Sequence, residues 1–348
     1  MLAQADTTPQ AKGRGKLPQL DQIAEAANLR NLAKPRRAAA RDPLDKYTKG
    51  VTNPIHDAHP DEAYVYIDAP TIKEWENYSG EKLLAIPFEF EVTKPELHEN
   101  YSRCIFSAVQ EIMKASSVGV ATPLPNKECL AREQMPNTFL IYDLSELHYQ
   151  ILTQQTVWAS SNITFRVISP TMNCPMFMFA IKGLRSLEPT LVRAMVRDLW
   201  NDETTSKFIR DGLQAMDDEA RSGTAIAIQN FLDSMKISLL KTCGSGAAAE
   251  PTFNIYMNSS LFDDITSWSN LRTHLVNCKY HSNKLGQGYT VIAPYHCSLC
   301  HGVDHPRGMC PFPDIEGWRG PKERREPINQ KRGPNNRNSA KTSCDRWN

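Results

Sequence analysis

Hydrophobic residues recur with regular periods in the middle of the chain. Residues 84–92 alternate between apolar and polar positions, as in a half-buried strand. Beyond Pro95, apolar side chains return every three or four residues, which predicts a helix of about five turns with one buried face. The apolar positions of this helix are Leu97, Tyr101, Ile105, Ala108, Val109, Ile112 and Met113. Three prolines within residues 117–136 then predict a boundary before the next folded segment.

The segment 138–201 gives the clearest indication of a fold. Its predicted elements are, in order, a strand at 139–144, a helix from Ser145 to Gln155, a strand at 163–168, a turn at 170–175, an antiparallel strand at 176–181 and a helix from Pro189. Strand, helix, strand, strand and helix in this order make up most of a ferredoxin-like split βαβ unit, the architecture of RRM modules. The predicted fold class is therefore α+β, with an RRM-like body.

Further elements are predicted beyond this unit. They are a helical patch at 207–213, a helix at 224–235, strands at 236–241 and 252–257, and a helical face at 268–276. The predicted parts of the chain are a basic arm and linker at 1–80, a strand–helix segment at 81–135, the α+β body at 136–290, a zinc knuckle at 295–312 and a basic tail at 319–348. We expect the arm and the tail to be largely disordered, because both are charged and poor in apolar residues.

The net charge of +1 conceals an uneven distribution of charge. Residues 1–50 contain ten Lys and Arg against five Asp and Glu, and residues 319–348 contain nine against three. The rest of the chain carries twenty-one against thirty-one. An acidic body with basic ends indicates that contacts with phosphate groups would come from the arms and the knuckle. The alternative is that both basic ends only keep the chain in solution.

The sequence also bears on the compartment of the protein. No apolar run approaches the roughly eighteen residues needed to span a bilayer, and the N-terminus lacks the pattern of a secretory signal. Nine cysteines are an odd number, so a disulfide framework is not expected. We therefore expect an intracellular protein, in the nucleus, the cytoplasm or both, with no membrane partner.

Four residues near the C-terminus have the spacing of zinc ligands: Cys297, Cys300, His305 and Cys310. Three thiolates and one imidazole complete a tetrahedral Zn²⁺ site. Because the protein supplies all four ligands, no position is left for a catalytic water, and the expected role is structural. A loop of fourteen residues cannot bury a core, so metal binding must supply the folding free energy, on the order of 10–16 kcal/mol for structural zinc peptides.

Three other interpretations use the same residues. The first two cysteines and the histidine after them have the pattern for covalent attachment of a c-type haem, which leaves His305 and Cys310 without a role. An integrase-like site would instead combine two upstream histidines with the first two cysteines, namely His274, His281, Cys297 and Cys300. The third interpretation is that these are surface residues with no metal. The zinc knuckle accounts for more of the pattern than any of them.

Zinc knuckles are among the modules that read single-stranded RNA, by stacking on unpaired bases and bonding to their edges. Many carry an aromatic residue just after the first cysteine, where this chain has Ser298. Base contacts are therefore predicted from an apolar platform of Leu299, Val303 and Met309, with Tyr295 beside it. The full set of candidate nucleic-acid-binding residues is Tyr295, Leu299, Val303, Arg307, Met309, Trp318, Arg319, Lys322, Arg324 and Arg325.

A second hypothesis about nucleic acid follows from the RRM-like order, because RRM modules stack bases on aromatic residues of their central strands. Phe177 and Phe179 are two residues apart on one predicted strand, which places them on one face, and Tyr142 lies on a candidate neighbouring strand. The Lys-Gly-aromatic signature is missing, and Leu140 stands where an aromatic would be expected. Two phenylalanines at this spacing are more often core residues.

Three short runs lie in the knuckle and in the residues just after it: Asp304-His305-Pro306, Cys310-Pro311-Phe312-Pro313 and Gly317-Trp318-Arg319-Gly320-Pro321. Together with Phe139–Tyr142 and Val157–Phe165, they resemble Gag-like proteins of fungal retrotransposons, mostly those of basidiomycetes. The resemblance covers residues 80–321 in outline and is strongest at the knuckle. It implies binding of the element's RNA and self-association.

The favoured function is non-enzymatic, sequence-tolerant binding of single-stranded RNA or DNA, with RNA preferred and Zn²⁺ as cofactor. The alternative is a zinc-stabilised protein–protein interaction module with an incidental basic tail, which the serine at position 298 supports. We find no convincingly placed pair of metal-binding carboxylates, nucleophile elbow or phosphate loop. We therefore expect neither an enzyme nor a small-molecule substrate.

Overall fold

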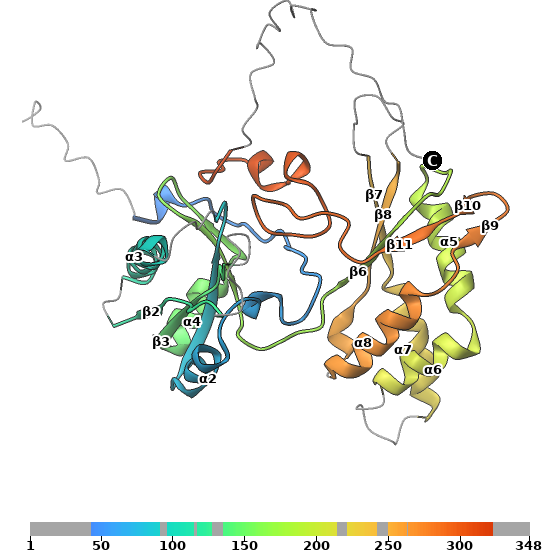
Figure 1. Cartoon of the computed structure of the whole chain (residues 1–348), viewed down its shortest axis with the longest axis horizontal. Helices are drawn as coiled ribbons and strands as arrows, with labels where there is room; N and C mark the ends of the chain where they lie inside the picture. The colour runs from blue at the N-terminus through green and yellow to red at the C-terminus, as the bar shows by residue number, and fades with distance from the viewer. Residues whose placement is uncertain are drawn as a thin grey trace, which may run out of the picture. The chain divides into compact units, whose positions relative to one another are not determined.

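The computed structural model of the chain describes residues 43–90, 96–114, 117–126, 135–213, 221–241, 250–262 and 264–322 (Figure 1). The chain divides into two units, Met1–Asp45 and Lys46–Asn348. A short 3₁₀ turn at Pro43–Lys46 spans this division, and all other described elements belong to the second unit. These elements form antiparallel sheets with accompanying helices, so the predicted mixed α+β class is confirmed.

The first sheet has five strands in the order β2-β3-β1-β5-β4, and every neighbouring pair is antiparallel. Its strands are β1 (Glu81–Pro87), β2 (Gly119–Ala121), β3 (Phe139–Leu144), β4 (Val157–Ala159) and β5 (Thr164–Ile168). The helices along this part of the chain are α2 (Ala69–Asn77), α3 (Glu96–Met113) and α4 (Glu146–Thr153). The strand predicted at 139–144 has the observed bounds. Ser145 caps α4 as predicted, because its side chain accepts a hydrogen bond from the His148 amide at 3.3 Å.

The two faces of the first sheet have different neighbours. Val157 and Ala159 of β4 pack against residues of the C-terminal cysteine-rich segment, whereas the Trp158 indole donates to the Leu152 carbonyl of α4 at 2.9 Å. Residues paired across an antiparallel ladder point to the same face. Arg166 of β5, the partner of Val157, therefore faces the same way as Val157 and Ala159.

The second sheet has four strands in the order β11-β6-β8-β7 and is also antiparallel throughout. Its strands are β6 (Phe177–Lys182), β7 (Lys236–Leu240), β8 (Thr252–Tyr256) and β11 (Tyr289–Val291). The helices α5 (Pro189–Trp200), α6 (Glu203–Leu213), α7 (Arg221–Asp233) and α8 (Ile265–Val276) accompany it (Figure 1). The shorter elements are the ribbon of β9 (His281–Ser282) and β10 (Gly286–Gln287), and 3₁₀ turns at Glu62–Tyr64, Ser259–Leu261, Arg307–Met309 and Phe312–Asp314.

Strand β8 shows how the second sheet separates its two faces. Phe253 and Ile255 lie in one hydrophobic core with residues of α5 to α8, among them the buried Trp200 and Trp268. The alternate residues of β8 point the other way, as the period of a strand requires. One face of this sheet is therefore committed to the helices, and the opposite face is available for other contacts.

The predicted pairing of strands 163–168 and 176–181 is wrong. β5 is flanked by β1 and β4, and β6 is flanked by β8 and β11, so neither strand has a free edge for the other. The ferredoxin-like unit predicted over 138–201 does not form from those strands, because β3 and β5 belong to the first sheet and β6 to the second. The predicted helices near 97–113, from Pro189 and around 268–276, and the strands at 236–241 and 252–257, are all observed with shifts of a few residues.

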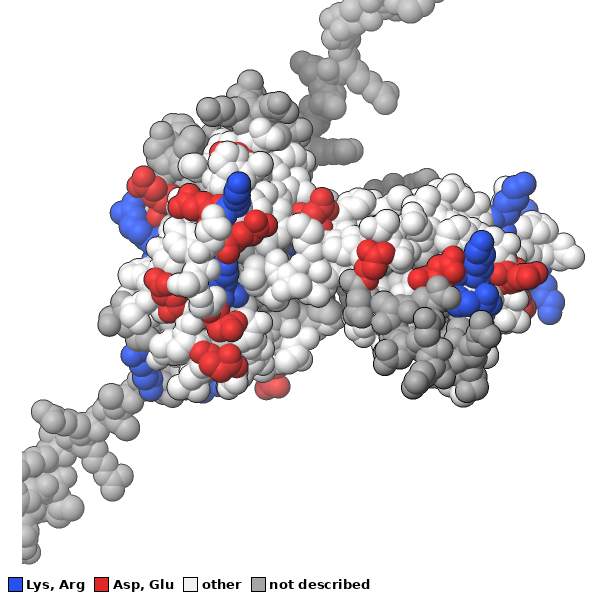
Figure 2. Space-filling model, turned by 90° about the horizontal axis from the view of Figure 1, so that it is seen from below, with Lys and Arg blue, Asp and Glu red and all other residues white. Residues whose placement is uncertain are grey.

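The described residues show neither a face of one charge in the view of Figure 2 nor a helix suited to a membrane. Acidic and basic side chains are interspersed over the face of the molecule that Figure 2 shows. No helix in the described part of the chain is both long enough and apolar enough to cross a membrane. Most of the arm and tail that we expect to be disordered lies outside the described residues.

We predict that Tyr280→Phe destabilises the protein by about 1–3 kcal/mol. The buried Tyr280 hydroxyl accepts from the Trp200 indole at 3.0 Å and donates to the Leu275 carbonyl at 2.7 Å, so both partners would lose a hydrogen bond. Urea unfolding would measure the change. Tyr289→Phe is the matched control, because that side chain is 51% exposed and its hydroxyl contacts only the exposed Glu250; we expect a change within about 0.5 kcal/mol. Equal stability of the two variants would contradict the prediction.

Candidate metal centre

The four predicted ligands come together in the folded chain. One donor atom from each of Cys297, Cys300, His305 and Cys310 lies within 4.8 Å of the others, and all four residues are buried. Ligands bound 2.0–2.3 Å from a tetrahedral Zn²⁺ are roughly 3.5–3.8 Å apart. The Cys300 Sγ and the His305 Nε2 are 3.4 Å apart, which agrees with that geometry. The donor set therefore fits a structural zinc ion. It is the only cluster of three or more metal-binding side chains found among the described residues.

Local hydrogen bonds shape the backbone around the first two ligands. The Cys297 amide donates to the Gly302 carbonyl and the His301 amide donates to the Cys297 carbonyl, both at 2.8 Å, while the Gly302 amide points at the Cys300 Sγ from 3.4 Å. His301 has a φ of +67°, in the left-handed region that side chains with a Cβ rarely adopt. Burial lowers the pKa of His301 to about 4, so the ring is neutral, and its Nε2 donates to the Pro87 carbonyl at 3.0 Å. That contact stabilises the unfavourable backbone conformation.

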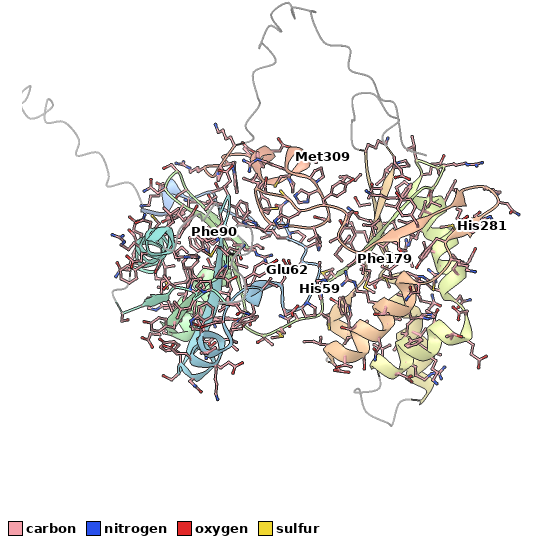
Figure 3. All side chains as sticks on the ribbon, viewed as in Figure 1. His59, Glu62, Phe90, Phe179, His281 and Met309 are labelled. Atoms are coloured by element: carbon pink, nitrogen blue, oxygen red, sulfur yellow. The ribbon has the colours of Figure 1, made fainter. Side chains whose placement is uncertain are left out.

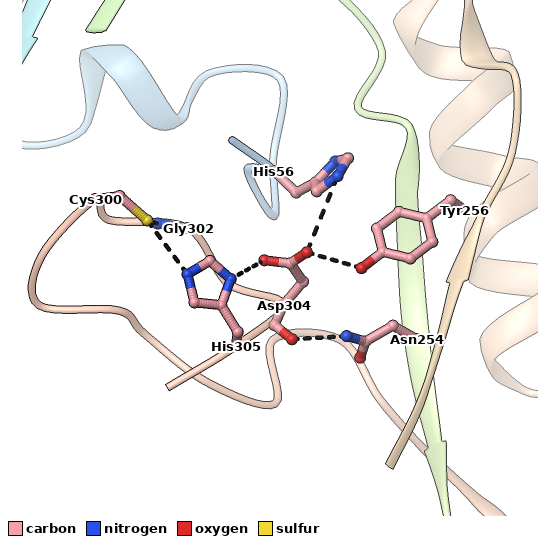
Figure 4. Close-up of polar contacts among 7 residues, drawn as sticks. All are labelled: His56, Asn254, Tyr256, Cys300, Gly302, Asp304 and His305. Carbon is pink, nitrogen blue, oxygen red and sulfur yellow. Dashed lines mark hydrogen bonds and ion pairs between the residues drawn. The ribbon is translucent and has the colours of Figure 1, made fainter. Parts of the chain in front are cut away.

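Asp304 lies between the ligand His305 and the second sheet (Figure 4). Its Oδ1 accepts a hydrogen bond from the His305 Nδ1 at 2.7 Å, which leaves Nε2 to face the thiols. Metal-binding histidines commonly bond to a carboxylate in this way, which fixes both the tautomer and the orientation of the ring. The Asp304 Oδ2 accepts from the Tyr256 hydroxyl at 2.7 Å, and its backbone carbonyl accepts from the Asn254 amide group at 2.6 Å. The His56 Nε2 is 3.9 Å from the same Oδ2.

These contacts change the pKa values of the groups involved. Burial raises the pKa of Asp304, but hydrogen bonds from His305 and Tyr256 outweigh it and lower the pKa overall, so the carboxylate stays charged. Burial lowers the pKa of His305, whereas the bond to Asp304 and the nearby thiols raise it to about 11. Asp304 therefore makes the imidazole more basic and a better metal ligand.

The apolar platform predicted on the knuckle is mostly not exposed. Leu299 is fully buried and packs in a cluster with Phe88 of the turn after β1, and Val303 is buried in a second cluster with Tyr256. Met309 is 39% exposed, and Figure 3 shows it near the top of the view, on the outside of the C-terminal segment. Of the three platform residues, only Met309 is therefore accessible to a base.

Two aromatic candidates are also engaged within the protein. The half-buried Tyr295 ring lies 5.1 Å from the Lys182 ammonium, and its hydroxyl is 3.1 Å from the Thr252 hydroxyl. Trp318 is buried against Phe88 and Phe312. Neither ring presents a free face comparable to that of an exposed aromatic.

The cationic candidates divide by exposure. Arg307 is half-buried, pairs with Glu89 and donates to the Ser298 carbonyl at 3.3 Å. Arg319 and Lys322 are exposed directly after the buried Trp318. Arg324 and Arg325 lie outside the described residues.

The residues proposed to stack bases on the body lie in different places. Phe177 and Phe179 are both fully buried, and the prediction that they share a face is wrong. The register of β6 against β8 shifts between them, so that Phe177 packs with Val303 while Phe179 packs among the helices (Figure 3). Tyr142 belongs to the first sheet, where its ring stacks on Tyr78 at 4.4 Å and lies over Gly119.

The arrangement of the side chains favours the Cys3His set over the two alternative ligand arrangements. His274, proposed for an integrase-like site, has its Nε2 2.9 Å from the Thr205 hydroxyl and does not join the cluster. The thiols of Cys297 and Cys300 are grouped with His305 and Cys310, the two residues that the haem interpretation leaves without a role.

Sequence reasoning assigned no site role to Asp304, Asn254 or Tyr256, although all three support the cluster. A carboxylate directly before a ligand histidine is a detectable signal, because such histidines usually bond to a carboxylate or a carbonyl. Asn254 and Tyr256 carry no such signal. They are close to the cluster only because β8 packs beside it.

Comparison of the chain with protein-family models, with curated proteins and with solved structures finds no match.

We predict that the reduced protein binds one zinc ion per chain, and that Cys297→Ser or Cys300→Ser abolishes this stoichiometric binding, since a tetrahedral site needs all four donors. Zinc displaced from the purified variants can be counted with a chromophoric chelator. Cys104→Ser is the control, because Cys104 is exposed on α3 and is not one of the four ligands. Full zinc content in the Cys300→Ser variant would refute this assignment of ligands.

Proposed function

We propose that this protein is a non-enzymatic binder of single-stranded nucleic acid, with RNA preferred, of the Gag-like type that fungal retrotransposons encode. The observation that supports it most directly is the buried Cys3His cluster followed by a basic segment. Exposed Arg319 and Lys322 begin that segment where the chain leaves the knuckle, and the sequence from 319 to 348 holds nine Lys and Arg against three Asp and Glu. Cations in this arrangement neutralise phosphates without reading sequence.

The burial of the knuckle's apolar residues makes the proposal more specific. With Leu299 and Val303 packed inside, base contacts are left to Met309 and to the exposed Ser298 and His296. So few base contacts give little discrimination among sequences. The expected binding is therefore dominated by phosphate contacts and tolerant of sequence.

We infer further that the second sheet is a ferredoxin-like unit, displaced along the chain from the one the sequence predicted. β6 and β7 are both antiparallel to β8, which lies between them, so β6 and β7 run parallel with helices in their connection. α8 then leads from β8 to β11 at the edge beside β6. This is the connectivity of a split βαβ unit. The face on which RRM modules bind bases here carries Phe177, which is buried, so this face is not part of the proposed nucleic-acid site.

A zinc-stabilised protein-interaction module is the second candidate, with the basic tail incidental. Two observations favour it: Ser298 takes the place of an aromatic residue, and the platform residues Leu299 and Val303 are buried. We propose no catalytic role and no small-molecule or membrane partner. Self-association is proposed on the resemblance alone.

Fluorescence anisotropy with labelled single-stranded RNA separates these candidates. We predict that binding requires zinc and persists at physiological salt, and that Cys300→Ala and His305→Ala weaken it strongly. Both variants lose a metal ligand, and the cluster that contains the cysteine ligands also holds Trp318, directly before the exposed Arg319 and Lys322. Binding that ignores zinc and disappears at physiological salt would reduce the tail to a nonspecific polycation. The protein-interaction module would then be the better proposal.

The contribution of the exposed cations can be measured separately. We predict that the double variant Arg319→Gln/Lys322→Gln makes RNA binding less sensitive to salt. The plot of log K, the RNA association constant, against log salt concentration should become less steep by about 1.4, since each lost phosphate contact on a single strand removes about 0.7. The matched control is Lys73→Gln/Arg103→Gln, which neutralises two exposed cations on α2 and α3. An equal effect of the two double variants would contradict a site at the C-terminal segment.

A further inference from the structure

The cysteine-rich segment from Tyr295 to Trp318, here called the knuckle segment, does not stand apart from the two sheets. It contacts both of them through buried residues and hydrogen bonds. The arrangement gives the metal centre a role in the architecture of the protein that is independent of nucleic acid.

Contacts with the first sheet come from both ends of the knuckle segment. The Glu89 amide, in the turn after β1, donates to the Leu299 carbonyl at 3.0 Å, and the Glu89 carboxylate pairs with Arg307. Phe312 and Trp318 pack with Phe88 in one hydrophobic cluster that also includes Val157 and Ala159 of β4 and three of the metal ligands, Cys297, Cys300 and Cys310. The ligand residues are thus part of the core that covers this face of the first sheet.

Contacts with the second sheet are made mainly by Val303 and Asp304. Asp304 bonds to Tyr256 and to Asn254, two of the residues of β8 that point away from the helical core (Figure 4). Val303 is buried with Phe177 and Tyr256. Because Asp304 also bonds to the ligand His305, two consecutive hydrogen bonds lead from a metal ligand to the second sheet.

Residues 56–58 complete the junction. The Val303 amide donates to the His56 carbonyl at 3.0 Å. Asp57 forms a bidentate ion pair with the buried Arg166 of β5, at 2.8 and 3.1 Å. Arg272 of α8 donates to the Ala58 carbonyl. This short segment therefore bonds to the first sheet, to the knuckle segment and to a helix of the second sheet.

We propose that the metal ion acts as a clamp that holds the two sheets together through the knuckle segment. The residues that contact the sheets lie within or next to a fourteen-residue loop that has no core of its own, so their positions depend on metal binding. Loss of the ion frees Leu299, Val303 and Asp304 from their fixed geometry, so that the knuckle segment no longer joins the sheets and, of the described residues, only 56–58 still bond to both. Asp304 is the positioning residue that carries this coupling to β8.

Hydrogen exchange with mass spectrometry tests the clamp on the full chain, in reducing buffer, over a urea series, with zinc and with a zinc chelator. With zinc, the slowly exchanging amides of β1 and β3 and those of β6 and β8 should share one free energy of opening and one dependence on urea, as expected when both sheets open together. After chelation the amides of the first sheet and those of the second should exchange through two separate openings, because their coupling requires the ion. Chelation that changes exchange only within residues 297–310 would overturn the proposal.

A variant outside the ligand set keeps the test independent of knuckle folding. Tyr256→Phe removes the hydroxyl that bonds to Asp304 and leaves all four ligands in place. We expect zinc affinity, measured by competition with a chromophoric chelator, to fall by up to about tenfold, the lower end of the loss seen when a direct partner of a metal ligand is removed, because Tyr256 acts on His305 through Asp304. Tyr289→Phe, which loses a hydroxyl that bonds to Glu250 and to none of these residues, should leave it unchanged. Equal zinc affinities and unchanged coupling in both variants would also overturn the clamp. Neither measurement involves nucleic acid, so failure here leaves the proposed RNA binding untouched.

Discussion

A loop of fourteen residues has too little apolar surface to fold by itself, and this constraint explains the arrangement around Cys297–Cys310. The loop is stabilised from two sides. Its four donor atoms converge within 4.8 Å, so that an ion can link them, and its apolar Leu299 and Val303 are buried against strands that already have cores of their own. The two contributions are connected by Asp304, which bonds both to a ligand and to β8.

This packing distinguishes the segment from a knuckle carried on a flexible arm. A knuckle that reads bases must leave apolar or aromatic surface open to them. Here Leu299 and Val303 face inward, and Tyr295 is held against Lys182 and Thr252. The exposed cations that follow are better suited to phosphate than to base edges. In the function that we propose, nucleic acid is therefore bound by the segment after the metal centre more than by the metal centre itself.

The sequence predicted those features that local physics determines. The ligand set followed from the spacing of thiols and imidazole, and the bounds of β3, the cap at Ser145 and the helix from Pro189 followed from periodicity and capping. The pairing of strands did not follow, because β4 and β11 have only three residues each and left no periodic pattern, yet they occupy the edges that decide where β5 and β6 can pair. Tyr256 and Asn254 could not be assigned to the metal centre either, since their proximity depends on the packing of β8 against a segment about fifty residues away in sequence.

The outermost strands of the sheets limit how copies of the chain could join. An exposed strand edge is a template for pairing with another chain, and proteins protect such edges by keeping them short or charged. Both edges of the first sheet, β2 and β4, are three residues long, as is β11 in the second. The longer edge strand β7 begins at the exposed Lys236 and is followed by the exposed Lys241. Among the described residues, the edges of these two sheets therefore disfavour strand addition between copies, which favours assembly through side-chain surfaces.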